Sequence, residues 1–360
     1  MIDSKYLELI LVIDEAGSMS KAAKKLHLTQ SALSHRLKKL EDYLGFEVFH
    51  RTGNRLLFTE AGIEIRDKAK LIAHEFSGLE EKIEKLKRAE ASKYIHGYSD
   101  REAQRLQDQA STVAEMLHYD SRWEAGATIL EVGCGVGAQT EIIATANPDA
   151  HFFSIDIAEK SLALAQDRIN QLGLTNVTFR QLDIFDLVGY RKEKFDHVFV
   201  CFVLEHLAEP QKVLRLLRSV VKETGTITVI EGDHGSTFFH PAHPAASRVV
   251  DAQVRLQARK GGNALIGREL YSLLAQTSWR DINVSPRQIY VDDARPTRKA
   301  GFILNTFTAM IEGMANEIVA ANLLRYEEVE AGIQGLKATF AEGGSFSYTF
   351  FKAVARVGKT

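Results

Sequence analysis

The chain has 360 residues, a formal charge of −2, and 45% hydrophobic and 26% charged residues. These values are ordinary for a globular protein and exclude a generally basic chain, so binding to nucleic acid requires a local basic surface. The two cysteines are too few for a disulfide framework, no apolar run approaches the ~20 residues of a membrane span, and the N-terminus lacks a signal-peptide pattern, which together predict a cytoplasmic protein without a membrane partner.

The first 58 residues predict three short helices followed by a β-hairpin. Ser18 or Ser20 is suited to cap the second helix, and Thr29 is suited to cap the third helix, Gln30–Leu44. Two short runs of strand-forming residues then flank a Thr-Gly-Asn turn at 52–54. Two helices with a tight turn and a following wing are typical of a winged helix-turn-helix domain.

Residues 59–90 predict a single long helix, within a linker segment 59–93, and Thr59 is suited to cap it. Its apolar positions recur in alternating steps of four and three residues, which is the pattern of a two-stranded coiled coil. The alternative is an amphipathic helix packed on its own domain. We expect a homodimer formed through residues 65–86, with the seam Ile65, Ala69, Ile72, Phe76, Leu79, Ile83 and Leu86.

The segment from Ser18 to Leu40 contains six lysines or arginines and no acidic residue. Such a surface supplies phosphate contacts, while short polar side chains at the start of the third helix suit the major groove. Arginines in the wing would reach adjacent backbone or the minor groove. The alternative is an ordinary solvated helix face. We expect double-stranded DNA as a partner, contacted by Lys21, Gln30, Ser31, Ser34, His35, Lys38, Arg51 and Arg55.

Four ungapped segments resemble the DNA-binding domain of LysR-type regulators: Gly17–Leu26, Leu28–Glu41, Leu44–Arg51 and Phe58–Gly62. The resemblance covers about residues 1–62 and implies a winged domain whose linker helix forms a dimer that reads a pseudo-palindromic site. One departure matters, because that family normally continues into a periplasmic-binding-protein-like effector domain and nothing later in this sequence resembles one. The family's small-molecule inducer and tetramer therefore cannot be carried over to this chain.

Residues 94–360 alternate strand and helix patterns. Helical patterns separate the first five strands, which predicts a parallel sheet with right-handed crossovers. Two further stretches, 234–274 and 295–341, are predicted to be largely helical. The seven candidate strands are Thr128–Val132, His151–Ile155, Val177–Leu182, His197–Phe202, Gly225–Ile230, Asp281–Val291 and Ser345–Val357.

A glycine-rich turn follows the first of these strands, where three alternate glycines let the backbone approach a ligand. Such a turn alone also fits a permissive dinucleotide fingerprint. Glu131, just before the turn, favours a cationic group and would repel a pyrophosphate. Asp156, at the end of the second strand, is placed to accept ribose hydroxyls, and Asp183, at the end of the third, to accept an adenine amino group. The three acids favour a cofactor with sulfonium and amino-acid charges and no phosphates.

This pattern, with the final strand from Ser345, resembles class I S-adenosylmethionine-dependent methyltransferases over roughly residues 94–360. Residues 195–207 resemble the quinone-biosynthesis and small-molecule group. The resemblance implies an α/β fold with a seven-stranded Rossmann-like sheet whose last strand inserts antiparallel. It implies S-adenosyl-L-methionine as the cofactor, bound by Tyr98, Glu131, Gly133, Cys134, Gly135, Gly137, Asp156, Ile157, Asp183, Ile184 and Cys201.

Two of these assignments leave an alternative open. Cys201 would lie at the edge of the cofactor, but a cysteine in a strand is also a common small core residue. Tyr94 and Tyr98 lie where that group often has aromatic cofactor contacts, and ordinary helix packing explains them equally well.

Methyl transfer requires the protein to position the acceptor and, where needed, to remove its proton. A histidine with a pKa near neutrality suits that role. The candidates are His206, after the fourth strand, and Asp233 and His234, after the fifth; the alternative is that these are structural or solvated loop residues. His240 and His243 lie nearby, but no ligand spacing of the helical kind is present, so no metal is expected.

The two helical stretches are predicted to cap an acceptor pocket, which favours a small, partly apolar acceptor. The alternative for residues 295–341 is a dimer contact. Six apolar side chains are candidates to line the pocket or to pack in the core: Phe238, Phe239, Phe302, Phe307, Met310 and Met314.

The sequence therefore predicts a DNA-binding transcription regulator fused to a methyltransferase that acts on a small molecule, with domains 1–58, 59–93 and 94–360. The alternative is a regulator whose methyltransferase fold only senses S-adenosylmethionine or S-adenosylhomocysteine. A DNA methyltransferase is disfavoured, because Cys201-Phe-Val-Leu stands where base-modifying enzymes often carry an Asn/Asp-Pro-Pro-Tyr/Phe motif.

Overall fold

The computed structural model describes residues 4–52, 55–91, 100–190 and 193–358. Its contacts divide the chain into two compact units, Met1–Glu90 and Ala91–Thr360. Tyr94 and Tyr98 lie outside the described residues, so their predicted role stays a prediction.

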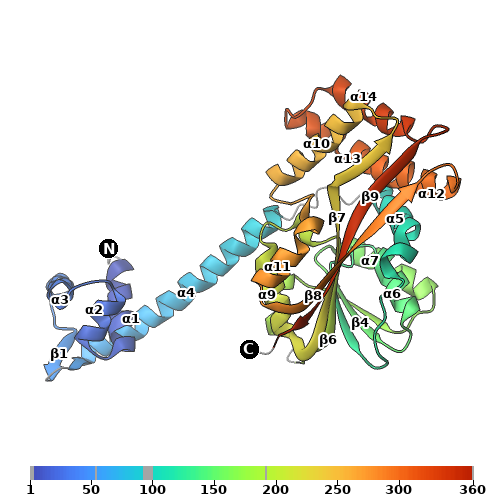
Figure 1. Ribbon diagram of the computed structural model, residues 1–360. Coiled ribbons are helices and arrows are strands. Elements are labelled where there is room, and N and C mark those ends of the chain that lie inside the picture. The colour runs from blue at the N-terminus through green and yellow to red at the C-terminus, as the bar shows by residue number, and fades with distance from the viewer. Residues whose placement is uncertain (1–3, 53–54, 92–99, 191–192, 359–360) are drawn as a thin grey trace. The chain divides into compact units, whose positions relative to one another are not determined.

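The first unit contains three helices and a two-stranded antiparallel sheet (Figure 1): α1 (Ser4–Ala16), α2 (Met19–Lys25), α3 (Gln30–Leu44), β1 (Phe49–Thr52) and β2 (Arg55–Phe58). Ser18 caps α2 and Thr29 caps α3, each accepting a hydrogen bond from a backbone N–H three residues later. Gly45 ends α3 in the left-handed region, with φ of 78°. These elements confirm the predicted winged helix-turn-helix.

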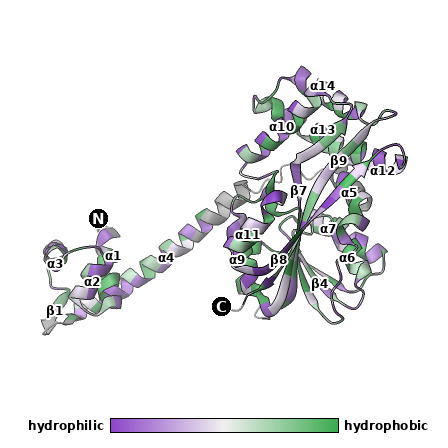
Figure 2. Cartoon of the chain, viewed as in Figure 1, coloured by the Kyte–Doolittle hydropathy of each residue, from purple (hydrophilic) through white to green (hydrophobic). Residues whose placement is uncertain are grey.

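The long helix α4 (Glu60–Ala91) begins where it was predicted. Thr59 Oγ1 accepts a hydrogen bond from the N–H of Gly62 at 2.9 Å, which caps the helix. Near its start, the fully buried Ala69 packs into the core of the first unit. Further along, the predicted seam is exposed, and polar and apolar residues alternate along the helix in Figure 2. The exposed seam residues are Ile72, Phe76, Leu79 and Ile83.

The second unit is built on a seven-stranded sheet in the order β5-β4-β3-β6-β7-β9-β8. Its strands are β3 (Thr128–Val132), β4 (His151–Asp156), β5 (Val177–Gln181), β6 (Phe195–Cys201), β7 (Val221–His240), β8 (Trp279–Val291) and β9 (Ser345–Val357). The first five strands pair in parallel, whereas β9 runs antiparallel between β7 and β8. This confirms the sheet that the methyltransferase resemblance implies.

Helices cover both faces of the sheet, with α5 (Asp100–His118) and α6 (Ala138–Ala146) on one side and α9 (Pro210–Val220) and α11 (Leu270–Gln276) on the other (Figure 1). Each face has its own apolar core. The carboxyl ends of the five parallel strands share one edge of the sheet. Because helices cover both faces, this edge is where loops can hold a ligand.

The remaining helices are α7 (Glu159–Gln171), α8 (Leu187–Tyr190), α10 (Pro244–Arg259), α12 (Pro296–Ala300), α13 (Ala309–Ala320) and α14 (Tyr326–Ala338), with the π-helix η4 (Gly301–Thr308) and the short 3-10 helices η1 (Ile184–Asp186), η2 (Leu204–His206) and η3 (Ile266–Glu269).

The prediction for the fifth strand was too short. The sequence predicted Gly225–Ile230, but β7 continues to His240, so residues 234–240 are strand and not helix. The extension is stabilised by pairing with β9, where Phe239 lies opposite Phe346 and the two rings stack at 5.8 Å. Helices α10, α13 and α14 gather around this extended end (Figure 1), and residues 295–341 are largely helical as predicted.

Across the described residues, none of the helices combines the length and apolar character that crossing a membrane requires.

Candidate functional site

The glycine-rich turn between β3 and α6 packs tightly at its two ends and faces open space in the middle. Gly133, Gly135 and Gly137 all have positive φ, at 67°, 52° and 75°. A Cβ on Gly133 would lie 2.6 Å from Val203 Cγ2, and a Cβ on Gly137 would lie 2.9 Å from Ala165 Cβ, whereas a Cβ on Gly135 would meet nothing within 4 Å. The space beside Gly135 therefore fits a ligand held against the turn.

Two half-buried carboxylates lie at the same edge of the sheet as this turn. Asp156 ends β4, and its two oxygens accept hydrogen bonds from the N–H groups of Gly135 and Ala158, each at 2.8 Å. Burial raises the pKa of Asp156, and these backbone bonds oppose the rise. Asp183 follows β5 and caps η1 by accepting from the N–H of Phe185 at 2.9 Å. Both acids lie at the carboxyl edge where the sequence predicted them.

The predicted residues next to these acids differ in exposure. Ile157 is exposed and Ile184 is half-buried, so both are available at the rim. Cys134 is buried within the turn, and Cys201 is buried at the end of β6 in the apolar core. Burial raises the pKa of both thiols, which keeps them protonated. The core packing of Cys201 matches the second of its two predicted roles.

Glu131 lies beneath the turn rather than on its surface. Its side chain is 2% exposed, and one oxygen, Oε2, accepts hydrogen bonds from Ser154 Oγ at 2.6 Å and Thr140 Oγ1 at 2.8 Å. Burial raises the pKa of Glu131 to about 7. Near neutral pH this carboxyl is only partly ionised, so it attracts a cation less strongly than the sequence argument assumed.

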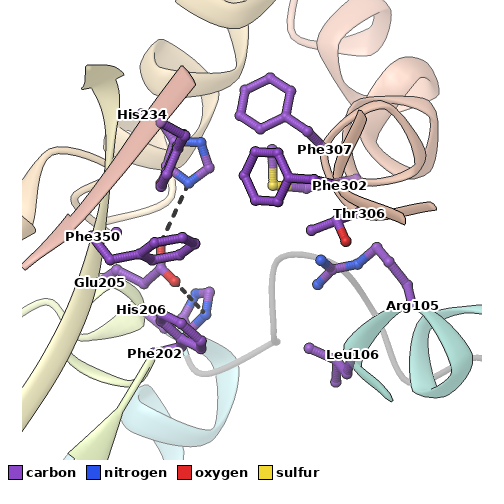
Figure 3. Close-up of a pocket in the computed structure, with 13 residues that line it drawn as sticks. Arg105, Leu106, Phe202, Glu205, His206, His234, Phe302, Thr306, Phe307 and Phe350 are labelled. Atoms are coloured by element: carbon purple, nitrogen blue, oxygen red, sulfur yellow. Dashed lines mark ion pairs between the residues drawn. The ribbon is translucent and has the colours of Figure 1, made fainter. Parts of the chain in front are cut away.

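A pocket lies at the ends of β6 and β7 (Figure 3). Its histidines and Glu205 lie on one side, and Arg105 and Thr306 lie on the other. Aromatic rings from β9 and η4 also line the space, which gives the pocket apolar walls beside its few polar groups. The lining residues are Arg105, Leu106, Phe202, Glu205, His206, Gly232, His234, Phe302, Thr306, Phe307, Met310, Tyr348 and Phe350.

The two predicted histidines meet at one acid in this pocket. His234 is buried within β7, and His206 ends the short helix η2 (Leu204–His206) that follows β6. Their Nε2 atoms lie 3.8 and 3.7 Å from the two oxygens of Glu205. Burial lowers the pKa of His234, while the charge of Glu205 opposes that change. A buried neutral imidazole beside a carboxylate is a suitable proton acceptor.

The third predicted catalytic residue, Asp233, has a structural partner. Its side chain is 4% exposed and accepts two hydrogen bonds from Arg268, at 2.8 and 2.7 Å. Successive residues of a strand point to opposite faces, so Asp233 and His234 face different ways. The bidentate ion pair occupies both oxygens of Asp233, and the geometry therefore favours the histidines as proton acceptors.

The sequence identified only part of this pocket. Phe302, Phe307 and Met310 line it, but Phe238 is 70% exposed on the outer face of β7, so that candidate was wrong. Phe239 and Met314 pack in the core cluster instead. The polar side chains of the pocket that the sequence did not indicate are Arg105, Glu205, Thr306 and Tyr348. Only Glu205 carried a local signal, because it directly precedes His206.

Five of the proposed DNA-contacting residues lie on α3. Leu33, Leu37 and Leu40 are buried, which turns the opposite face of the helix outward. Along that face and on α2, the predicted residues are exposed except for Ser34, which is half-buried: Lys21, Gln30, Ser31, Ser34, His35 and Lys38. Arg51 and Arg55 lie in the wing strands, and their side chains are outside the described part of the structure.

Two family models match separate parts of the chain. Residues 4–63 match the bacterial regulatory helix-turn-helix protein, lysR family, and residues 124–277 match a methyltransferase domain. The chain joins a LysR-type helix-turn-helix domain to a methyltransferase domain. The strand order described above is typical of class I methyltransferases.

Curated relatives match parts of this chain. The HTH-type transcriptional regulator MetR of Haemophilus influenzae is 46% identical over 61 residues, covering 17% of this chain and 20% of that protein. The ubiquinone biosynthesis O-methyltransferase of Methylococcus capsulatus is 35% identical over 103 residues, covering 29% of this chain and 42% of that protein. The matches thus span between a fifth and about two fifths of these relatives.

Among solved structures, the YcgJ protein of Bacillus subtilis is similar with a TM-score of 0.44 and 14% identity, covering 69% of this chain and 99% of that one.

Within the described part of the methyltransferase and helix-turn-helix domains, no group of three or more His, Cys, Asp or Glu side chains is arranged to hold a metal ion.

Proposed function

We propose that this chain is a DNA-binding transcription regulator whose second domain uses S-adenosylmethionine to methylate a small molecule. The observation that carries the proposal is the contact between two loops. Gly133 of the glycine turn packs directly against Val203, which begins the loop bearing Glu205 and His206. A ligand against the turn and an acceptor in the pocket would thus lie on neighbouring loops.

The cofactor would be held by the glycine turn and the acids around it. Asp156 and Asp183 would accept hydrogen bonds from the nucleoside, and Ile157 and Ile184 would pack against it at the rim. The open side of Gly135 supports this fit, because a side chain there would take the ligand's place. S-adenosylmethionine supplies an activated methyl group. The chain's own contribution is to orient the acceptor and to take its proton.

The acceptor pocket supports a small, partly aromatic or apolar molecule with a removable proton. Phe202, Phe302, Phe307 and Phe350 provide flat apolar walls, so they would orient a planar group and exclude water. His234 faces this space with its pKa lowered by burial, and it would accept the proton as the methyl group is transferred. Residues of α5, η2, β7, β9 and η4 line this small pocket, which supports a small molecule over a protein or a nucleic acid as the acceptor.

The first domain supports binding to double-stranded DNA as a dimer. The exposed polar face of α3 presents Gln30 and Ser31 to base edges and Lys38 to phosphate. The exposed seam of α4 would bury its apolar residues against the same helix of a second copy. A protein that binds the cell's own DNA would also act in the cytoplasm, in agreement with the low cysteine content.

The proposal is tested in two steps on the full-length chain. Calorimetry with S-adenosylmethionine and S-adenosylhomocysteine measures cofactor binding. The protein is then incubated with methyl-tritiated S-adenosylmethionine and either a small-molecule extract or DNA from upstream of its gene. We expect label in an organic-extractable small molecule. Label in DNA would contradict a small-molecule acceptor. Cofactor binding without any methyl transfer would favour a domain that only senses S-adenosylmethionine or S-adenosylhomocysteine.

The coupling between the domains is tested by fluorescence anisotropy on the same DNA at fixed salt. A several-fold difference in DNA affinity between S-adenosylmethionine and S-adenosylhomocysteine would show that the methyltransferase domain reports to the DNA-binding domain. Equal affinity with both ligands would mean that the two domains are only tethered.

A further inference from the structure

Glu205 occupies a central place in the pocket, although it was not among the residues predicted to be catalytic. One of its carboxylate oxygens faces the Nε2 of His206 and the other faces the Nε2 of His234, at 3.7 and 3.8 Å. The side chains of Glu205 and His234 are 11% and 8% exposed, respectively. An acid shared by two pocket histidines is placed to control their protonation.

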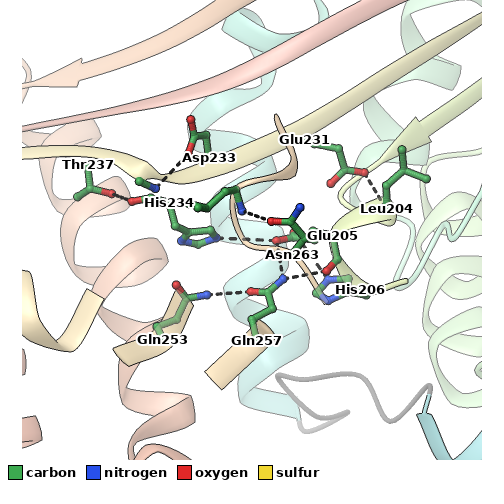
Figure 4. Close-up of polar contacts among 12 residues, drawn as sticks. Leu204, Glu205, His206, Glu231, Asp233, His234, Thr237, Gln253, Gln257 and Asn263 are labelled. Carbon is green, nitrogen blue, oxygen red and sulfur yellow. Dashed lines mark hydrogen bonds and ion pairs between the residues drawn. The ribbon is translucent and has the colours of Figure 1, made fainter. Parts of the chain in front are cut away.

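Buried amides from α10 hold Glu205 in this position (Figure 4). Gln257 Nε2 donates to the Glu205 backbone oxygen at 3.0 Å and to its Oε2 at 3.2 Å. Gln253 Nε2 in turn donates to Gln257 Oε1 at 2.9 Å. Both glutamines are fully buried, and burying amides away from water is costly unless their hydrogen bonds are made. Their chain of bonds therefore fixes where the Glu205 carboxylate lies.

A second buried acid fixes the backbone before Glu205. Glu231 Oε1, on β7, accepts hydrogen bonds from the N–H groups of Val203 and Leu204, at 3.0 and 2.7 Å. The N–H of Asn263 also donates to the Glu205 backbone oxygen at 2.8 Å. Glu205 is thus anchored through both its main chain and its side chain, which is what an orienting residue requires.

The two nitrogens of His234 have different surroundings. Nε2 faces the Glu205 carboxylate, whereas the buried Nδ1 has no hydrogen-bond partner among the described residues. The ring is held edge-on against Tyr348, with centroids 5.5 Å apart, and lies 6.0 Å from Phe307. A neutral imidazole carries one N–H and one lone pair, and a carboxylate beside one nitrogen favours the N–H there.

We infer that Glu205 is the positioning residue of the pocket: it holds His234 in the tautomer with hydrogen on Nε2 and leaves Nδ1 as the atom that takes a proton from the acceptor. The proton then moves from the acceptor to Nδ1, and the resulting imidazolium is compensated by the Glu205 carboxylate. Other charged or titratable groups around His234 are Arg105, His206, Tyr348 and Asp233, of which Asp233 is already paired with Arg268. Only the identity of the proton donor rests on the proposed function.

The test reads the tautomer directly in the ligand-free full-length protein. Long-range ¹H–¹⁵N spectra of protein labelled at histidine distinguish a protonated from an unprotonated ring nitrogen, and the spectrum of H234Q assigns the His234 signals. In the unmodified protein we expect an N–H at Nε2 and a free lone pair at Nδ1. The opposite tautomer would overturn the inference without any variant of Glu205.

Variants then test whether the Glu205 carboxylate causes this tautomer preference of His234. Glu205→Gln keeps the shape but removes the charge that favours an N–H at Nε2, and it is expected to raise the fraction of the Nδ1–H tautomer several-fold. Glu209→Gln is the matched control, since Glu209 is exposed and only four residues away. Identical spectra for the two variants would overturn the inference.

The same samples separate this inference from the proposed function. S-adenosylhomocysteine is titrated into the unmodified protein by calorimetry after the spectra are recorded. Absence of binding would contradict the proposed function, while the tautomer result would stand on its own.

Discussion

The two sides of the sheet edge in the methyltransferase domain are built in different ways. At the ends of β3, β4 and β5, a backbone turn and half-buried acids lie close together in the chain, from Glu131 to Asp183. At the ends of β6 and β7, buried side chains come from segments as distant as Arg105 and Phe350. Under the proposed function, the first region binds the cofactor, a ligand that many proteins share, and is called the cofactor side. The second region binds an acceptor particular to this chain and is called the acceptor side. Substitutions should therefore separate cofactor affinity from turnover.

The largest expected effect is on the acceptor side. His234→Gln removes the proposed proton acceptor, so the rate of methyl transfer should fall by about 10²–10⁴-fold, the usual contribution of a general base. The affinity for S-adenosylhomocysteine should be unchanged, because the site around Gly135 is intact. Single-turnover assays and calorimetry measure the two quantities. His240→Gln, an exposed change on the same strand, is the control. Parallel losses of rate and affinity would erase the distinction between the two sides.

The next largest effect is expected on the free energy of unfolding, from a change at Glu131 beneath the glycine-rich turn. Burial raises the pKa of Glu131 from 4.5 to about 7. The folded protein therefore holds a proton that the unfolded chain releases, so this group's contribution to stability is present below pH 4.5 and is lost as the pH rises through 7. Glu131→Gln has no such loss, and its stability relative to the unmodified protein should increase by up to about 3 kcal/mol between pH 4 and pH 8.

Urea unfolding at both pH values measures this difference, with the exposed Glu223→Gln as the control. The same variant also tests whether Glu131 contributes to cofactor binding. Because Glu131 is only partly ionised near neutral pH, the affinity for S-adenosylmethionine should change little. A pH-independent difference in stability would show that Glu131 is ionised in the folded protein.

Asp156 should affect cofactor affinity more than any other acid on this side. Its two oxygens accept from Gly135 and Ala158, so Asp156→Asn would place an amide N–H against one of these donors and remove the charge. The affinity for S-adenosylhomocysteine should fall about 30-fold, in the range of a charged hydrogen bond. Asp149→Asn, at an exposed turn before β4, is the control. Unchanged binding would remove Asp156 from the cofactor site.

The cofactor side was predictable because its signals are local. The glycine turn and the acids that end the next two strands follow from spacing alone, and the caps at Ser18 and Thr29 likewise located the helices of the first domain. Burial was not predictable from that spacing. Glu131 was expected at the ligand, but Ser154 Oγ and Thr140 Oγ1, on neighbouring elements, hold it below the turn.

The acceptor side was less predictable because its signals depend on distant partners. Glu205 gains its importance from His234, 29 positions later, and from Gln257, 52 positions later. The predicted fifth strand ended too early, because residues from 234 onward were assigned to a helical stretch, whereas pairing with β9 keeps the chain extended. No local pattern in the sequence reports such pairings, which depend on which segments the fold brings together.

The smallest expected effect tests the open space beside Gly135. Gly135→Ala places a methyl group there at a φ of 52°, so stability should fall by about 1 kcal/mol. Gly173→Ala is a matched control, since Gly173 also has a positive φ, 68°, and open surroundings, but lies after α7 and away from the turn. Both variants should lose similar stability in urea, whereas only Gly135→Ala should bind S-adenosylhomocysteine more weakly, because its methyl group takes space that the ligand needs. Equal affinity in the two variants would mean that the ligand does not use the space beside Gly135.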